Sequence, residues 1–235
     1  MSITPITSRP DAAQIVEEYF SAPIRILQEW AAPCAEEVAA LLEGGDLSRA
    51  ALDALVEPYA LRSLDLQGAR VHGAGFIAAL GLLPDTRGHL AWWQCEDRRR
   101  LLLASQSVNK EYIDYRELEW YRVPMSTGLP HVAGPYVDYL CRDEYTITIA
   151  VPALSGETPL GVAGLDLLVS EVERELIPRF SALGQQVTLV NGVGRVVVST
   201  DPRYAAGDSV RGSRLADLAR TPCDEVALDV IVESS

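Results

Sequence analysis

Apolar residues near the start of the chain recur every three or four positions, a period that predicts a long helical region. Ser8 as a cap, Pro10 in the first turn and Asp11 at the positive end of the helix dipole favour a start at this point. The period continues to Glu43, and Gly44 follows as a stop signal. An uninterrupted helix of this length would be roughly 50 Å long. Such a helix packs along a whole domain or against a twin.

Two prolines, Pro23 and Pro33, lie inside this helical pattern. Proline lacks the backbone N–H and clashes with the preceding turn, so we expect either kinks or two consecutive helices. A second, shorter helix is predicted from Ser48 to about Val56, with Asp46 or Ser48 as its cap.

The pattern then changes to that of strands. The run from Ala69 to Leu83 is typical of a buried strand whose glycines let another backbone approach, and it includes His72 as a core residue. Two further segments, HLAWWQCED and RRRLLLASQSV, are predicted to pair as strands. Successive side chains of a strand point to opposite faces, so Trp92 and Trp93 must face opposite sides.

The last third of the chain predicts a smaller α+β module. Ser170 and Glu173 match a capping box for a helix that ends near Leu183. Two β-branched runs between Gln185 and Thr200 surround Asn191-Gly192, which predicts a hairpin. A short helix and a final strand follow.

The acidic composition excludes several classes of partner. The formal net charge is −13, with 48% hydrophobic and 23% charged residues, as in an ordinary globular protein. Binding to nucleic acid needs a concentrated basic surface, so no direct nucleic-acid partner is predicted. The acidity would also repel an anionic membrane, and no stretch approaches the roughly 20 apolar residues of a membrane-spanning helix.

The cysteines and histidines give no reason to expect a metal or a cofactor. The four cysteines are scattered without a C-x-x-C pair, and the three histidines lack ligand spacing. Free thiols suit a reducing compartment. The first residues, MSITPITSRPDAAQ, lack the basic start and apolar core of a secretion signal. A cytoplasmic location is therefore predicted.

Asp166 is the first residue that calls for a chemical explanation. In LGVAGLDLLV, strand alternation places Asp166 on the same face as Val162 and Gly164. A carboxylate on a largely apolar face costs several kcal/mol unless it is paired. Ser170 is expected to cap the following helix, which leaves either a structural hydrogen bond or a ligand cation as the partner of Asp166.

A second carboxylate, Asp138, follows Tyr136 in the segment GPYVDYL. In an extended segment both side chains point the same way. A carboxylate beside a phenol suits an ammonium group, because the aromatic face adds a cation–π term of up to about 2 kcal/mol. The same fragment is also compatible with a surface Tyr and Asp at a sheet edge.

The segment ELEWYRVP supplies an aromatic pair, Trp120 and Tyr121, among charged residues. The segment fits either a strand or a helix, and Arg116 falls on the same side as Trp120 in both. Taken alone, an aromatic pair here indicates packing as readily as ligand binding.

The order of these elements resembles the ligand-binding region of double Cache domains, the PAS-like sensors of chemoreceptors and kinases. The resemblance rests on W-Y, a loop, G-P-Y-x-D, a strand ending in A-V-P, and G-V-x-G-x-D before a helix. It covers nearly the whole chain and includes the long first helix and the hairpin NGVGRVVVSTDPRYAAG. Its motifs are densest from Trp120 to Asp166.

The resemblance implies a set of ligand-binding residues. In amino-acid-binding members an Arg-x-Trp pair and a tyrosine hold the ligand carboxylate, and acids with tyrosines hold its amino group. By position, the candidate ligand-binding residues here are Trp120, Tyr121, Tyr136, Asp138 and Asp166. The arginine is missing, because Leu118 stands two residues before Trp120. Arg116 is the remaining candidate, about 7 Å further along an extended chain.

Together these features predict an α+β fold, with a long N-terminal helix packed on two PAS-like antiparallel-sheet modules. The predicted divisions are a helical region at 1–60, a larger ligand-binding module at 61–183 and a smaller module at 184–235. The predicted function is that of a non-catalytic small-molecule sensor for an amine, a polyamine or an amino acid. It would signal to a separate regulator protein and form a homodimer through its N-terminal helix.

Two other functions remain open on the sequence. The chain could be a dimerisation or interaction subunit whose pocket is vestigial. Ser107 and Lys110 also form a Ser-x-x-Lys pattern, as in some serine hydrolases. Neither Ser-Asp-Asn nor Lys-Thr-Gly accompanies this pattern, so a hydrolase is the weaker alternative.

Overall fold

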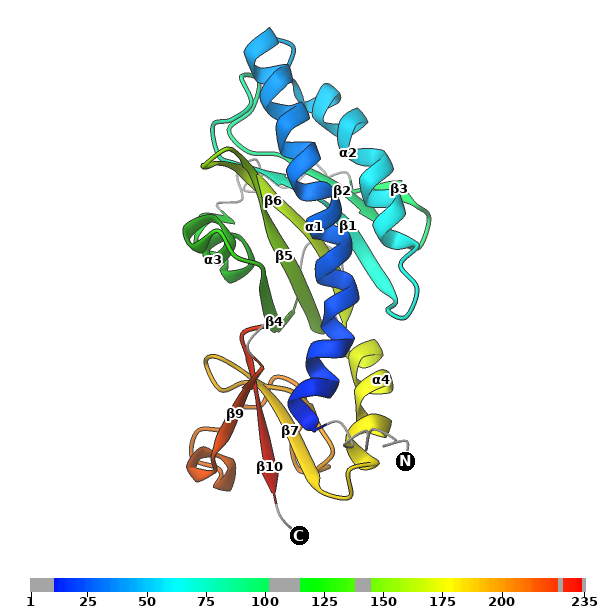
Figure 1. Cartoon of the computed structure of the whole chain (residues 1–235), viewed down its shortest axis with the longest axis vertical. Helices are drawn as coiled ribbons and strands as arrows, with labels where there is room; N and C mark the ends of the chain where they lie inside the picture. Colours follow the sequence, from blue (N-terminus) through cyan, green and yellow to red (C-terminus); the bar gives the residue numbers. More distant parts are fainter. Residues whose placement is uncertain (1–10, 102–114, 138–144, 224–225, 234–235) are drawn as a thin grey trace, which may run out of the picture.

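The computed structural model describes residues 11–101, 115–137, 145–223 and 226–233. The molecule is elongated, and its first helix runs beside both a larger and a smaller sheet (Figure 1). This arrangement confirms the predicted α+β fold with a long helix on two antiparallel sheets. We call the two parts the larger module and the smaller module.

The first helix, α1, spans Ala12–Gly44 without a break. Asp11 is its cap: its side chain accepts a hydrogen bond from the Gln14 backbone at 2.9 Å, and the Gln14 side chain accepts one from the Asp11 backbone. Of the two outcomes expected at Pro23 and Pro33, two consecutive helices are wrong because α1 is continuous, and kinks stay a prediction. An apolar stripe that includes Pro23 is buried along α1, and this packing offsets the backbone bonds that the prolines cannot donate.

The second helix, α2 at Arg49–Leu64, begins after Ser48, whose side chain caps it as predicted. It runs past the expected end at Val56. Its partner is α1, because the indole of Trp30 donates to the Ser63 hydroxyl at 3.1 Å in a buried contact.

The larger module is built on a six-stranded sheet in the order β3-β2-β1-β6-β5-β4, with antiparallel neighbours throughout. Its strands are β1 at Val71–Ala78, β2 at Leu90–Gln94, β3 at Arg99–Arg100, β4 at His131–Val137, β5 at Tyr145–Ser155 and β6 at Thr158–Leu168. The predicted buried strand and the predicted strand pair therefore exist, although β1 ends at Ala78 and β3 is very short within the described residues.

The two faces of this sheet pack against different layers. One face contacts α1 and α2 and contributes Trp93 to the main apolar core. The opposite face carries Trp92, in a separate cluster with Tyr115 and Tyr121. These come from a short 3-10 helix at Tyr115–Glu117 and from α3 at Glu119–Thr127. The predicted opposition of Trp92 and Trp93 is confirmed.

A helix, α4 at Val169–Ser181, joins the modules, and it starts directly from β6. Leu168 stands at the cap position and makes no side-chain capping bond. The predicted capping box is therefore wrong: strand and helix are contiguous, so Ser170 already lies inside the first turn.

The smaller module is a four-stranded antiparallel sheet in the order β8-β7-β10-β9. It contains the predicted hairpin, β7 at Gln186–Asn191 with β8 at Val196–Ser199, followed by a 3-10 helix at Arg214–Asp217, β9 at Arg220–Cys223 and β10 at Leu228–Glu233. Helix α1 contacts β9 and β10 as well as β5 and β6. One core cluster accordingly extends over both modules.

Candidate ligand-binding site

Asp166 lies on the face of β6 that is opposite to α1. Its carboxylate belongs to a residue that is only 6% exposed, and its backbone is paired with Gly73 of β1 and Thr148 of β5. The Thr148 hydroxyl donates to Asp166 Oδ1 at 2.5 Å. A structural hydrogen bond therefore exists, and it comes from the neighbouring strand.

Tyr136 of β4 extends this contact across a third strand, because its phenol hydrogen-bonds to the Thr148 hydroxyl. Thr148 has a single hydroxyl proton, which it gives to Asp166, so the phenol of Tyr136 must be the donor to Thr148. We call this series the hydroxyl relay, Tyr136–Thr148–Asp166.

The aromatic pair lies on α3, so the segment ELEWYRVP is α-helical from Glu119 onward, with Leu118 as an extended cap residue. Tyr121 is buried and Trp120 is partly buried. Both pack on Tyr115, whose ring centroid lies 4.9 Å from that of Tyr121 and 6.2 Å from that of Trp120. The Tyr115 hydroxyl donates to the Ala78 carbonyl at 2.7 Å, which anchors the aromatic group to β1.

Trp92 covers the part of the sheet between Asp166 and the aromatic side chains of Tyr115 and Tyr121. Glycines make room for it: a Cβ at Gly73 would lie 2.5 Å from the Trp92 indole nitrogen, and one at Gly164 would lie 3.3 Å from its ring. Gly73 is the backbone partner of Asp166. The indole therefore occupies the positions next to the carboxylate on the same face.

Helix α3 is also held to the sheet by a polar contact. The ring nitrogen Nε2 of His131, at the start of β4, lies 2.9 Å from a carboxylate oxygen of Glu119, at the start of α3. This contact fixes the helix that carries Trp120 against the strand that carries Tyr136.

The structure thus gathers four of the predicted residues on one sheet face: Tyr136 and Asp166 through Thr148, and Trp120 and Tyr121 above Trp92. Arg116 lies in the short 3-10 helix before α3, and its side chain is exposed. Asp138, Ser107 and Lys110 lie outside the described residues.

Three contributors were not singled out as ligand-binding candidates from sequence: Thr148, Tyr115 and Trp92. The relation of Thr148 to Asp166 depends on the register of two strands, which one strand pattern does not encode. Trp92 had a detectable signal, because glycines in the buried strand pattern at Gly73 and Gly164 indicate close approach by another group.

Other polar features lie away from this face. A cavity of about 440 Å³ lies between the α2–β1 connection and α4, lined by residues that include Asp65, Arg70 and Glu171. Within the described ranges, no cluster of three or more histidine, cysteine or acidic residues is placed to hold a metal ion. None of the helices in those ranges is long and apolar enough to cross a membrane.

Comparisons with known proteins agree on the architecture. A scan of family models finds no match, and none of the curated proteins matches either. Among solved structures, the ligand-binding domain of the Pseudomonas aeruginosa PAO1 amino-acid chemoreceptor PctB, bound to L-Gln, is similar with TM-score 0.61 and 21% identity. That similarity covers 94% of this chain and 84% of the PctB chain. The chain has the double Cache fold.

Two further double Cache structures support the assignment of the fold. The ligand-binding domain of the Pseudomonas fluorescens chemoreceptor CtaA with L-valine has TM-score 0.63 at 18% identity, over 94% of this chain and 90% of its own. The P. aeruginosa PAO1 chemoreceptor PctC with GABA has TM-score 0.58 at 15% identity, over 95% and 96%. In this chain the larger module, which carries the hydroxyl relay, comes before the smaller module in sequence.

Proposed function

We propose that this chain is a sensor domain that binds a small amine-bearing ligand on the larger module. The observation that carries the proposal is the buried Asp166 carboxylate at the end of the hydroxyl relay, on the sheet face that carries Trp92, Trp120 and Tyr121. A buried carboxylate next to aromatic faces favours an ammonium group over an anion.

Similar folds in proteins with known ligands support the same class of compound. The structures of PctB, CtaA and PctC were determined with L-Gln, L-valine and GABA respectively. Each of these ligands carries an amino group. The role proposed for this chain is accordingly binding and not catalysis.

Substitution of Asp166 tests this function. A thermal-shift and calorimetric panel of putrescine, L-ornithine, GABA and L-glutamine should contain a compound that stabilises the wild type, by about 2.7 kcal/mol at 100 times its Kd. Asp166→Asn keeps the shape of the side chain but removes its charge. We expect it to weaken binding by about 2 kcal/mol or more, roughly thirtyfold in Kd.

The matched control is Asp208→Asn, which removes one exposed carboxylate from the smaller module. It should leave the affinity unchanged. An Asp166→Asn variant that binds the same compound with wild-type affinity would refute the proposed site.

Recognition of a ligand carboxylate is a separate question, because Leu118 replaces the expected arginine. We propose that the site takes either an amine without a carboxylate or a longer ω-amino acid that reaches Arg116. L-ornithine and putrescine differ only in the carboxylate, so the ratio of their affinities decides between these two classes. If Arg116 contributes, Arg116→Ala should weaken L-ornithine selectively, whereas Arg122→Ala on the exposed side of α3 should not.

The homodimer through α1, the separate regulator protein, the cytoplasmic location and the contribution of Asp138 stay predictions. Light scattering of the intact chain measures its mass in solution and so tests the predicted homodimer. Deletion of α1 would be uninformative, because its buried stripe belongs to the main core.

A further inference from the structure

Asn191 in the smaller module is a buried amide, 5% exposed, with both ends of its side chain in use. Its oxygen accepts hydrogen bonds from the backbone of Val193 at 3.2 Å and of Arg195 at 2.8 Å, which builds the turn between β7 and β8. Its nitrogen donates out of the module, to the carbonyl of Gly134 in β4 at 2.7 Å. The turn of one module therefore holds a strand of the other.

The contact is made where β4 departs from regular pairing. Ala133 is paired with Thr148 and Tyr136 with Thr146, so the register shifts at Gly134. Gly134 has φ 120°, and a Cβ there would lie 2.7 Å from the Thr146 carbonyl. Asn191 thus supplies a donor to the backbone at a point where the ladder of β4 and β5 is locally disrupted.

This interruption lies two residues before Tyr136, the first member of the hydroxyl relay. A shift of β4 there moves the phenol relative to Thr148 and Asp166. The neighbouring strand meets the smaller module too: Tyr145 of β5 packs on Gly207, where a Cβ would lie 2.8 Å from its phenol oxygen. Strands β4 and β5 therefore both contact the smaller module, β4 at Gly134 and β5 at Tyr145.

We propose that Asn191 is a positioning residue for the ligand-binding site: through Gly134 it holds β4 where Tyr136 completes the relay to Asp166. The inference rests on the proposed function of that site. It gives the smaller module control over ligand affinity. By thermodynamic reciprocity, a ligand on the larger module must stabilise the Asn191–Gly134 contact by the same factor.

Two variants of the smaller module separate this role from general stability. Asn191→Asp keeps an oxygen that can accept from the turn, but it replaces the donor with an oxygen that faces the Gly134 carbonyl. Thr188→Val is the matched control. It removes the part-buried 2.8 Å hydrogen bond between the Thr188 and Ser199 hydroxyls, in the same hairpin as Asn191.

Hydrogen exchange without ligand is the first readout. We expect Asn191→Asp to speed exchange of the amides of β4, residues 131–137, by roughly tenfold, because one buried hydrogen bond is lost and a repulsion is added. Thr188→Val should leave β4 at the wild-type rate. An unchanged β4 in Asn191→Asp overturns the inference, whether or not any compound binds.

Calorimetric titration of putrescine, GABA and L-glutamine is the second readout. For a compound that binds the wild type, Asn191→Asp should weaken binding by roughly tenfold, and Thr188→Val should not. Faster exchange in β4 with unchanged affinity overturns the positioning role. If β4 exchanges faster but no compound binds the wild type, the contact is supported and the proposed ligand class is what fails.

Discussion

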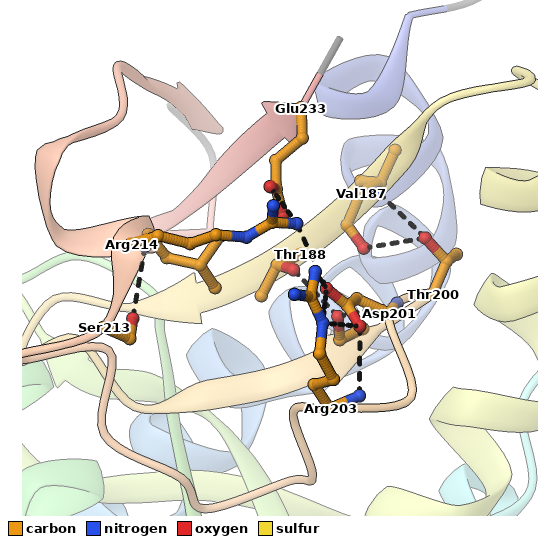
Figure 2. A network of polar contacts seen from close by, with 10 residues as sticks. Val187, Thr188, Thr200, Asp201, Arg203, Ser213, Arg214 and Glu233 are labelled. Atoms are coloured by element: carbon orange, nitrogen blue, oxygen red, sulfur yellow. Dashed lines mark hydrogen bonds and ion pairs between the residues drawn. The ribbon is translucent and has the colours of Figure 1, made fainter. Parts of the chain in front are cut away.

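Asp201 of the smaller module is a buried carboxylate, 2% exposed, whose charge is held by arginines (Figure 2). The Nε of Arg203 donates to its two oxygens at 2.9 and 3.0 Å, and Arg214 lies 3.4 Å away and also contacts Glu233. Hydrogen bonding to Arg203 lowers the pKa of Asp201 to about 2, against an ordinary value of 3.8. This network joins the end of β8 to the 3-10 helix and to β10.

The lowered pKa of Asp201 predicts a loss of stability in acid. A carboxyl whose pKa is lower in the folded state contributes stability that is complete above pH 3.8 and is lost as the pH falls towards 2. Because Arg203 and Arg214 are half-exposed, we expect a contribution of about 1–2 kcal/mol. Asp201→Asn should lower the free energy of unfolding at pH 7 by this amount and flatten its decline between pH 4 and 2, as measured by urea denaturation.

Asp65→Asn is the control for this prediction. Asp65 also pairs with an arginine, Arg98, but the pair is exposed, so its loss should change the unfolding free energy much less. Equal effects of the two substitutions would contradict the role assigned to burial.

Single residues also show how far the sequence led to the candidate site. Asp166 could be selected because strand alternation marks a lone polar group on an apolar face. Tyr136 was selected because it points the same way as Asp138 in an extended segment and matches the Tyr-x-Asp motif of the resemblance. Thr148 could not be selected, because only the pairing of β5 with β6 makes it a neighbour of Asp166. The expectation of a carboxylate on a buried strand face is confirmed for Asp166, whereas the supporting argument that Ser170 caps the following helix was wrong, because Leu168 stands at the cap position.

At the scale of elements, propensity signals gave the correct element types and some wrong boundaries. The pattern Ser-x-x-Glu at Ser170 fits a capping box, but β6 continues into α4 without a loop. Likewise α2 was predicted to end at about Val56 but continues to Leu64. In both cases tertiary packing decides where an element ends, and local pattern cannot report it.

The packing of α1 on α2 depends on one buried hydroxyl. Ser63 is fully buried; it accepts from the Trp30 indole at 3.1 Å and donates to the Tyr59 carbonyl at 3.0 Å. Ser63→Ala should lower the free energy of unfolding by about 1–3 kcal/mol, because the indole N–H is left without its acceptor. Denaturation followed by tryptophan fluorescence measures this loss.

Ser21→Ala provides the comparison, because Ser21 is an exposed serine of α1 that bonds only within its own helix in the contacts described. Its effect should stay within about 0.5 kcal/mol. A Ser63→Ala variant as stable as Ser21→Ala would show that the Trp30 contact contributes nothing.

At the scale of the whole molecule, the two sheets share one apolar core. Helix α1 packs on strands of both, and residues such as Val187 and Val230 belong to the same core as Ile149 and Leu165. The division at 183/184 stays a prediction, and residues on both sides of it belong to this core.

The shared core predicts one cooperative unfolding transition. The tryptophans all precede residue 121, so their fluorescence reports on α1 and the larger module. Hydrogen exchange in β7 and β10 reports on the smaller module. Both probes should give the same denaturation midpoint in urea. Two separated midpoints would mean that α1 does not couple the sheets.

The single stripe of α1 that serves both sheets has a consequence for the temperature at which the domain can work. A substitution that loosens β9 or β10 removes packing from the same helix that supports the sheet of the larger module. It therefore lowers the temperature up to which the sheet face with the hydroxyl relay stays intact, without changing any residue on that face. The heat tolerance of the proposed site is thus set partly in the smaller module, at positions remote from the relay.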